Sequence, residues 1–507
     1  MRTLVVGAGS AGAVIASRLT EDARHEVVLV EAGPDYPSGA LPPDLVDGTR
    51  NSMRRHDWGY GYRATTTGVG GAFDQPFPRG RVVGGSSAVN TCIALRGQPF
   101  DYDEWAARGL PEWSWERCLP YFKKLERDLD FANEWHGTDG PLPIRRHKRD
   151  ELVPWQAAFL EACREVGLGD CLDTNDPTSA GAGPHAMNKL EGRRVSAVQS
   201  WLAPAVRARP NLAIVPNTLV RRVRFRGLRA EGIECERFGR VFDLDADRVV
   251  LCAGAIATPG ILQRSGVGPR GEIERLGVAL VADVPGVGAR LLDHPGVAIF
   301  FLPRHAGFSS VSHPLIQTVA RISSRASACP NDVQIQPGSF VPLPDSELAG
   351  VTLAACIGKP RSVGRIRFPT ARAADPPRLD SRLLEDPSDQ DEARAALRFI
   401  SRLARTRVIS ALARPVYPRL APFDDEGNLR AALTRMTGSG YHPCGTVPMG
   451  AEDDPDAATD GRGRVRGTLG LYVADASLMP TIPSANTNLA TLMIGERFGE
   501  WLRTEPR

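Results

Sequence analysis

The chain opens with TLVVGAGSAGAVIASRL, residues 3–19, in which an apolar run leads into spaced glycines and then into a helical pattern. This order predicts a strand, a tight turn and a helix. Gly7 lets the chain turn, Gly9 leaves room for a pyrophosphate against bare backbone, and Gly12 lets the helix lie close to the strand. Phosphates would then face the helix N-terminus, where free amides and the helix dipole favour negative charge.

An acidic residue, Glu31, stands nineteen positions beyond Gly12 and directly follows the second apolar run, residues 26–30. At this distance a carboxylate can accept hydrogen bonds from a ribose 2′-hydroxyl. We therefore interpret the unit as a binding site for an adenine dinucleotide without a 2′-phosphate. An ordinary glycine-rich turn is the alternative, and the motif does not distinguish FAD from NAD.

The composition argues against several classes of partner. The 507 residues are 42% apolar, which allows a large core in two to three structural units. A formal net charge of +3 produces no field that would favour nucleic acid or a membrane surface. The longest charge-free stretches, 249–262 and 476–495, are too short or too polar to span a bilayer.

The cysteines and the first residues of the chain bear on the cellular compartment of the protein. Nine scattered cysteines without a CxxC pair predict reduced thiols, not a disulfide framework or a zinc site. The first predicted strand begins at residue 3 and leaves no room for a signal peptide ahead of it. We therefore expect a cytoplasmic protein.

Two further segments are rich in glycine. The first, GRVVGGSSAVN at residues 80–90, permits a backbone nest with several amides pointing one way, suited to a phosphate or the edge of a flat ring. A plain loop is an equal alternative there. The second, RVVLCAGAIATP at residues 248–259, predicts a buried strand and a turn without the glycine triplet, so no second dinucleotide fold is predicted. The aromatic cluster at residues 56–60 is interpreted as packing beneath a loop.

Residues 80–103 and 254–268 resemble the two signature segments of the glucose-methanol-choline (GMC) oxidoreductases. The resemblance extends to residues 57–58, 136–141, 284–288 and 293–295 and to the C-terminal part, so it spans nearly the whole chain. It implies a mixed α/β and α+β fold, with a Rossmann-type FAD-binding domain and a substrate domain built on a mostly antiparallel sheet. Within the family, the chain is most similar to bacterial oxidases and dehydrogenases of primary alcohols, such as the hydroxymethylfurfural oxidase and choline dehydrogenase branches.

The same resemblance suggests how the chain is divided. Residues 1–295 would form the FAD-binding domain, residues 296–437 the substrate domain, and residues 438–507 would return to the FAD-binding domain with the catalytic pair. In the middle region, short strands are predicted at 298–302, 332–335, 351–355 and 364–368. One clear helix is predicted to open at Ser388, with Asp391 completing a partial capping box.

FAD is the cofactor that the resemblance implies. In some relatives a histidine carries the flavin covalently at the place of Val89, and because valine cannot do so we expect non-covalent FAD. The residues expected to contact FAD are Gly7, Gly9, Ser10, Ala11, Gly12, Glu31, Ala32, Arg81, Val83, Gly84, Gly85, Ser86, Asn90, Thr91, Cys92, Ile93, Val220, Ala253, Gly254, Asp475, Ala476, Asn486 and Thr487.

Two places near the end of the chain are expected to carry the chemistry. Hydride removal from an alcohol carbon is easier as the hydroxyl loses its proton, so a base with a pKa near the working pH is needed. His442 can be that base, and the amide of Asn486 can hydrogen-bond the same oxygen. The pair resembles the histidine and asparagine type of the family. A helix predicted after Asn488 would offer free amides where flavin gains negative charge.

Each of these residues also has a structural interpretation. A histidine beside a proline is more often a satisfied structural residue, and asparagines commonly cap helices and turns. The other eight histidines show no metal-ligand spacing and are interpreted as structural, so no metal is predicted.

The sequence therefore predicts FAD-dependent oxidation of an alcohol to an aldehyde, with His442 taking the proton and flavin N5 the hydride. The first expectation is a primary alcohol, aromatic or furanic. The partners would be this small molecule and an electron acceptor, either O2 or a quinone or dye, and the oligomeric state is left open. Two alternatives are a non-redox use of the same scaffold, of the cyanohydrin lyase or photodecarboxylase type, and an NAD-linked dehydrogenase.

Overall fold

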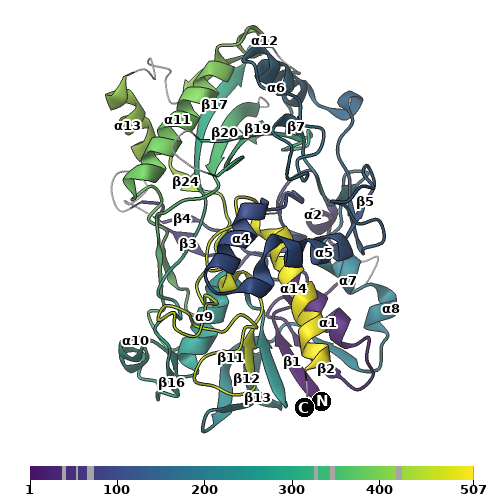
Figure 1. Cartoon of the computed structure of the whole chain (residues 1–507), viewed down its shortest axis with the longest axis vertical. Coiled ribbons are helices and arrows are strands. Elements are labelled where there is room, and N and C mark those ends of the chain that lie inside the picture. Colours follow the sequence, from purple (N-terminus) through teal and green to yellow (C-terminus); the bar gives the residue numbers. More distant parts are fainter. Residues whose placement is uncertain are drawn as a thin grey trace.

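The opening sequence lies at the centre of a five-stranded parallel sheet, at the lower end of the molecule in Figure 1. The computed structural model describes residues 1–36, 41–52, 55–65, 74–305, 307–324, 329–342, 349–417 and 425–505. Every neighbouring pair of strands in this sheet is parallel. The strand order is β10 (Leu212–Val215), β2 (Glu26–Val30), β1 (Arg2–Val6), β14 (Arg248–Leu251) and β25 (Leu471–Val473).

The turn after β1 leads into helix α1 (Ser10–Leu19), which confirms the predicted strand, turn and helix. Gly7 has a φ of +98°, a backbone conformation that side chains disfavour. A Cβ on Gly12 would lie only 1.9 Å from the carbonyl oxygen of Gly7. The turn is therefore tight because glycine occupies both positions.

The last helix, α14 (Thr487–Thr504), runs along α1, in yellow beside purple in Figure 1. A Cβ on Gly495 would lie 2.9 Å from a side chain of α1, so this glycine lets the two helices approach closely. Arg18 donates to both carboxylate oxygens of Glu496, at 2.7 and 2.9 Å. At the other end, Ser10 Oγ donates to Asn488 Oδ1 at 2.7 Å, and the two helix N-termini therefore lie side by side.

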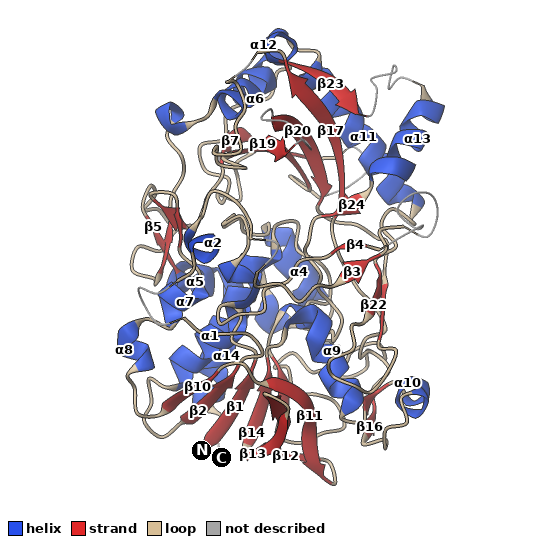
Figure 2. Ribbon diagram, turned by 180° about the vertical axis from the view of Figure 1, so that it is seen from behind, coloured by secondary structure: helices blue, strands red, loops and turns tan. Residues whose placement is uncertain are grey.

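The second large sheet is antiparallel and lies at the opposite end of the molecule (Figure 2). All its neighbouring strands are antiparallel, which confirms the antiparallel sheet expected in the middle of the chain. The sheet contains β23 (Ala413–Tyr417), β17 (Pro295–Pro303), β20 (Ala349–Ile357), β19 (Val333–Pro342), β18 (Thr318–Ile322) and β7 (Gly181–Pro184) in this order, with β24 (Gly438–Ser439) paired to β17.

Helices cover one face of the antiparallel sheet. They are α6 (Pro154–Glu165), α11 (Pro387–Ala404), α12 (Arg407–Leu412) and α13 (Glu426–Met436). The N-terminus of α11 differs from the prediction: Asp386 is its N-cap, and its carboxylate accepts from the backbone amide of Ser388 at 2.8 Å. Asp391 does not cap the helix but pairs with Arg394. Pro387 occupies the first helical position, where proline is common because its fixed φ suits the first turn.

The remaining elements are short and connect or flank the two sheets. The helices and helical turns are α2 (Pro43–Val46), η1 (Gly85–Ala88), α4 (Pro99–Ala107), η2 (Pro111–Trp113), α5 (Trp115–Leu125), η3 (Arg149–Glu151), α7 (Ala197–Trp201), α8 (Pro204–Arg207), α9 (Gly254–Arg264), α10 (Arg270–Arg275) and η4 (Ala476–Leu478). The strands are β3 (Gly61–Tyr62), β4 (Gln75–Pro76), β5 (Glu126–Asp128), β6 (Leu142–Ile144), β8 (Lys189–Leu190), β9 (Arg193–Arg194), β11 (Leu219–Arg226), β12 (Arg229–Arg237), β13 (Arg240–Asp245), β15 (Val267–Gly268), β16 (Ala282–Asp283), β21 (Arg365–Arg367) and β22 (Arg378–Asp380). Within the described ranges, no helix has the length and apolar character needed to cross a membrane.

Candidate active site

A cavity of about 730 Å³ is lined by residues from both sheets. It lies at the carboxyl ends of β1 and β2, the edge at which ligands bind in open parallel sheets. Residues of β19 and β20 form the wall on the side of the antiparallel sheet. A volume of this size is ordinary for the site of a cofactor with its substrate.

The cavity brings together most of the residues predicted to bind the cofactor or to carry the chemistry. These are Gly7, Gly9, Ser10, Ala11, Glu31, Ala32, Arg81, Gly85, Ser86, Asn90, Thr91, Ile93, Val220, Ala253, Gly254, His442, Asp475, Ala476, Asn486 and Thr487. The other predicted contacts, Gly12, Val83, Gly84 and Cys92, are not among the residues that line the cavity. Gly84, for example, donates its amide to the carbonyl oxygen of Ala8 at 2.7 Å and so supports the glycine-rich turn.

Two predicted acids line the cavity and also hold its backbone together. Glu31 accepts from the amide of Ala8 at 3.0 Å and from that of Gly33 at 2.8 Å. Burial raises the pKa of Glu31 to about 7, although these two hydrogen bonds act in the opposite direction. Asp475 accepts from the amide of Gly254 at 2.8 Å, and burial raises its pKa as well. Both carboxyl groups therefore fix turns that lead out of parallel strands.

His442 and Asn486 meet in the cavity, where Asn486 Nδ2 lies 2.9 Å from His442 Nε2. The backbone around His442 is anchored by buried Asp293, whose Oδ1 accepts from the amides of His442 at 2.8 Å and His294 at 2.9 Å. Arg79 donates to the carbonyl oxygen of Tyr441 at 2.8 Å. The imidazole of His442 is thus carried on a segment that is fixed on both sides.

A second histidine, His294, determines the tautomer of His442. His294 Nε2 faces two carbonyl oxygens, those of Pro483 at 3.0 Å and Gly358 at 3.1 Å. Carbonyl oxygens only accept, so Nε2 of His294 carries the proton and its Nδ1 is bare. That Nδ1 lies 2.9 Å from His442 Nδ1, which must therefore donate. The network leaves an unprotonated Nε2 on His442, facing Asn486.

Burial keeps both imidazoles neutral. It lowers the pKa of His294 to about 4. The pKa of His442 is lowered well below its ordinary value of 6.5, by burial first and then by the nearby His294 and Arg79. At neutral pH His442 therefore presents a free lone pair. Its pKa lies below the value near the working pH that was expected of the base, because burial disfavours the charged imidazole.

The loop that carries Asn486 is also fixed by hydrogen bonds to Asp101 and Lys359. Ser484 donates its amide and its hydroxyl to Asp101 Oδ2, at 2.9 and 2.7 Å. Lys359 reaches the other oxygen of Asp101 at 3.2 Å and donates to the carbonyl of Ile482 at 2.9 Å. Asn486 itself is the N-cap residue of α14. Its side chain thus extends from a rigid junction between this loop and the helix.

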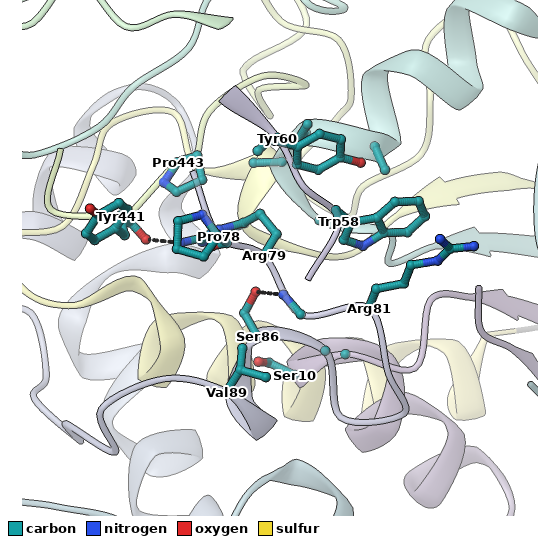
Figure 3. A pocket seen from close by; sticks show the side chains of 18 of the residues that line it. Ser10, Trp58, Tyr60, Pro78, Arg79, Arg81, Ser86, Val89, Tyr441 and Pro443 are labelled. Atoms are coloured by element: carbon teal, nitrogen blue, oxygen red, sulfur yellow. Dashed lines mark hydrogen bonds between the residues drawn. The ribbon is translucent and has the colours of Figure 1, made fainter. Parts of the chain in front are cut away.

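Aromatic and cationic side chains form another part of the lining, shown in Figure 3. Trp58 and Tyr60 lie with their rings nearly parallel, with centroids 5.7 Å apart. The guanidinium of Arg81 lies over Trp58, 4.9 Å from the ring centroid, and Figure 3 shows Arg79 directed toward Tyr441. The cluster at residues 56–60 is predicted to pack beneath a loop. Tyr60 packs against a buried apolar cluster, and Trp58 and Tyr60 also line the cavity, which the sequence did not indicate.

A family model described as GMC oxidoreductase matches residues 1–296 with its N-terminal part and residues 360–495 with its C-terminal part. The chain belongs to the GMC oxidoreductase family. Its predicted resemblance to this family is confirmed, together with the fold and the FAD cofactor that the resemblance implied.

Relatives match this GMC oxidoreductase over nearly its whole length. It is 34% identical to the 5-(hydroxymethyl)furfural oxidase of Methylovorus sp., over 99% of this chain and 98% of that protein. It is 32% identical to the oxygen-dependent choline dehydrogenase of Brucella anthropi, over 98% and 94%. Among solved structures, pyridoxine 4-oxidase from Mesorbium loti covers 100% of both chains, with a TM-score of 0.91 and 30% identity. The protein is an FAD-dependent oxidoreductase that acts on alcohols.

The cavity of this GMC oxidoreductase fits FAD. Helices α1, α9 and α14 all begin at the cavity. In the described part of the chain no side chain caps the N-terminal amides of α1 or α14, whereas the first amide of α9, that of Gly254, is bound by Asp475. A Cβ on Gly254 would meet no atom within 4 Å, so the space reaches the backbone there. Positive helix ends beside open backbone suit the phosphates and the carbonyl edge of the cofactor.

His294 is predicted from the sequence to be only structural. The structure places this residue against the predicted base and makes it the group that sets its tautomer. The only signal available was its place in the segment 293–295, which resembles the family pattern. Gln334 and Gln336, on the antiparallel-sheet side of the site, carried no signal at all.

Proposed function

We propose that this GMC oxidoreductase oxidises primary alcohols to aldehydes, with His442 as the general base. The observation that carries this proposal is the unprotonated Nε2 of His442 beside the amide of Asn486, at 2.9 Å in the FAD-sized cavity. Both groups can address one hydroxyl oxygen, the first by taking its proton and the second by donating to it.

The residues divide the work as follows. His442 Nε2 takes the hydroxyl proton, while Asn486 Nδ2 donates to the oxygen as negative charge develops on it. His294 accepts from His442 Nδ1 throughout, so the imidazole keeps its orientation when it becomes charged. FAD, when bound, would supply the acceptor for the hydride that leaves the carbon, and O2, a quinone or a dye would take up the two electrons.

The cofactor would be held by the predicted contacts that line the cavity. The turn after β1 and the start of α1 offer amides to the phosphates, and Glu31 offers an acceptor to the ribose. Val89 also lines the cavity, and its side chain has no atom that could form a covalent bond to flavin. We therefore infer that FAD is held without a covalent bond. Relatives named for 5-(hydroxymethyl)furfural and for choline, both primary alcohols, support the substrate class.

The decisive experiment is anaerobic reduction of the bound flavin by a panel of alcohols. Primary benzylic or furanic alcohols are expected to bleach the flavin absorbance, and reoxidation by air compared with a quinone then identifies the acceptor. A parent protein whose flavin no alcohol reduces would contradict the proposal. Product analysis in the dark without an acceptor separates the non-redox alternative, because turnover there cannot be oxidation.

The pH profile of flavin reduction tests the state of His442. Its pKa is lowered below 6.5, so the neutral, active form prevails above that value and is lost only as the pH falls further. Asp293, which anchors both histidine amides, has its pKa raised to about 6 by burial. We expect kcat/KM for reduction to be constant from neutral pH to 6.5 and to fall below about pH 6. Stopped-flow measurements with flavin occupancy checked at each pH would show this, and an apparent pKa above 6.5 would exclude it.

A further inference from the structure

The wall of the cavity opposite the parallel sheet contains two glutamines from one strand. On β19, Val333 and Ile335 point into the core beneath the helices, while Gln334 and Gln336 alternate with them. Gln334 is directly opposite Cys356 of β20, and Gln336 is directly opposite Ala354. Cross-strand partners share a face, and Gln336, Ala354 and Cys356 all line the cavity.

The backbone fixes the orientation of both amides. Gln334, 1% exposed, places its Nε2 3.1 Å from the carbonyl oxygen of Ser484, which can only accept. Its Oε1 therefore faces Gln336, whose Nε2 donates to it at 3.0 Å. This leaves Gln336 Oε1 without a donor among the described residues, and Gln336 itself lines the cavity. Turning either amide would set two acceptors or two donors against each other.

This wall is uncharged. Its cavity-lining residues from the antiparallel sheet are Gly296, Gln336, Ala354, Ala355, Cys356 and Ser439. The neighbouring Leu315 and Ile316 are apolar. In the described part of the wall, nothing neutralises a quaternary ammonium or a carboxylate. A ligand end placed here must therefore be neutral, and its hydrogen bond must come from a donor.

The register also places Gln336 relative to the reacting group. Cys356 lies in the same cluster as His294 and His442, with ligand-type atoms of the three residues within 4.8 Å of one another. Gln336 stands two residues along β19 from the partner of Cys356, a step of about 7 Å. A substrate that reaches both His442 and Gln336 therefore needs its two polar groups to be separated by about the width of one aromatic ring.

We infer that Gln336 selects neutral primary alcohols that carry a second hydrogen-bond donor, such as a second hydroxymethyl group across a ring. One hydroxyl lies at His442 and Asn486, and the other donates to Gln336 Oε1. This inference rests on the proposed alcohol oxidation and adds the class of alcohol that the site prefers.

Three matched alcohols test the inference: 1,4-benzenedimethanol, its monomethyl ether and 4-methylbenzyl alcohol. The ether keeps the distal oxygen but has no O–H there. It therefore distinguishes hydrogen-bond donation to Gln336 from a general effect of a polar distal group. After correction for its two equivalent hydroxyls, the diol is expected to have a kcat/KM for flavin reduction about 10-fold above both analogues. Equal values for the diol and the ether would overturn the inference.

The variant Q336M keeps the volume of the side chain and removes the acceptor. With this variant, the kcat/KM of the diol is expected to fall to that of 4-methylbenzyl alcohol measured with the same variant. Q390M is the matched control, because Gln390 of α11 donates to the carbonyl of Leu384, which precedes the helix, and does not line the cavity. A diol preference that survives Q336M would also reject the role of Gln336.

Binding measured without turnover separates this inference from the proposed function. In a His442→Ala background, the flavin spectrum is titrated with the diol and the ether, with and without Q336M. Tighter binding of the diol, by about 10-fold and only with Gln336 present, supports the inference even if no alcohol proves to be oxidised. Equal dissociation constants reject it, whatever the alcohol panel shows.

Discussion

Replacing His442 by alanine is expected to slow flavin reduction by alcohols by about 10²- to 10⁴-fold, the usual contribution of a positioned general base. FAD should stay bound, because no hydrogen bond of the glycine-rich turn or of Glu31 involves this side chain. The measurement is anaerobic stopped-flow reduction at saturating alcohol, with the flavin content of each preparation fixed beforehand.

The loss should also depend on the acidity of the alcohol. A substrate with electron-withdrawing substituents loses its proton more readily, so the defect of His442→Ala should shrink for such substrates. His313→Ala is the matched control, since His313 does not line the cavity. A variant that reduces its flavin within about threefold of the parent would remove His442 from the mechanism.

Local motifs allowed the nucleotide site and the proposed catalytic pair to be predicted from the sequence. The turn after β1 depends on neighbours within a few residues, since Gly12 packs on Gly7 and Glu31 binds the amide of Gly33. His442 and Asn486 could be singled out because both belong to short segments with a family pattern. What such segments do not reveal is where the imidazole points or which nitrogen is protonated.

The residues that were missed act through contacts between distant parts of the chain. His294 contacts His442 across 148 positions, and a lone buried histidine gives no sign of such a partner. A strand pattern of period two divides β19 into two faces, but it does not tell which face meets a cavity. Gln336 can therefore be assigned to the site only when two features of the structure are known. They are the pairing of β19 with β20 and the hydrogen bond from Gln334 to the carbonyl of Ser484.

A second large effect is expected far from the reacting groups, at a buried ionic cluster. His136 Nε2 lies 2.6 Å from Asp173, and its Nδ1 lies 3.0 Å from both Glu126 and Asp128. Arg146 bridges Asp128 and Asp173 at 2.9 and 2.6 Å. Burial alone would lower the pKa of His136, but the three carboxylates raise it to about 10. Arg96 pairs with Glu126, so three cations balance three anions.

This cluster supports the segment next to the cofactor. Arg96 lies three residues beyond Ile93, which lines the cavity, and its amide donates to Asn175 at 2.9 Å. The amide group of Asn175 in turn donates to the carbonyl of Ala94 at 2.9 Å. A change that disrupts the ionic cluster is therefore expected to displace the segment from Ile93 to Arg96, next to the cavity.

His136→Leu is expected to destabilise the folded protein by about 3–5 kcal/mol, because it leaves three buried carboxylates with only two guanidinium groups. The midpoint of denaturant unfolding, followed by circular dichroism and by flavin release, measures the change. Arg149→Met is the matched control, since the pair of Arg149 and Glu161 is exposed and should contribute almost nothing.

The pH dependence gives an independent check of the same cluster. A histidine whose pKa rises from 6.5 to about 10 on folding adds stability that is complete below pH 6.5 and disappears as the pH rises through about 10. The gap in stability between parent and His136→Leu should therefore narrow toward alkaline pH. A gap of constant size from pH 6.5 to 10 would mean that His136 is neutral in the folded protein, and that the leucine variant loses packing and hydrogen bonds but not charge balance.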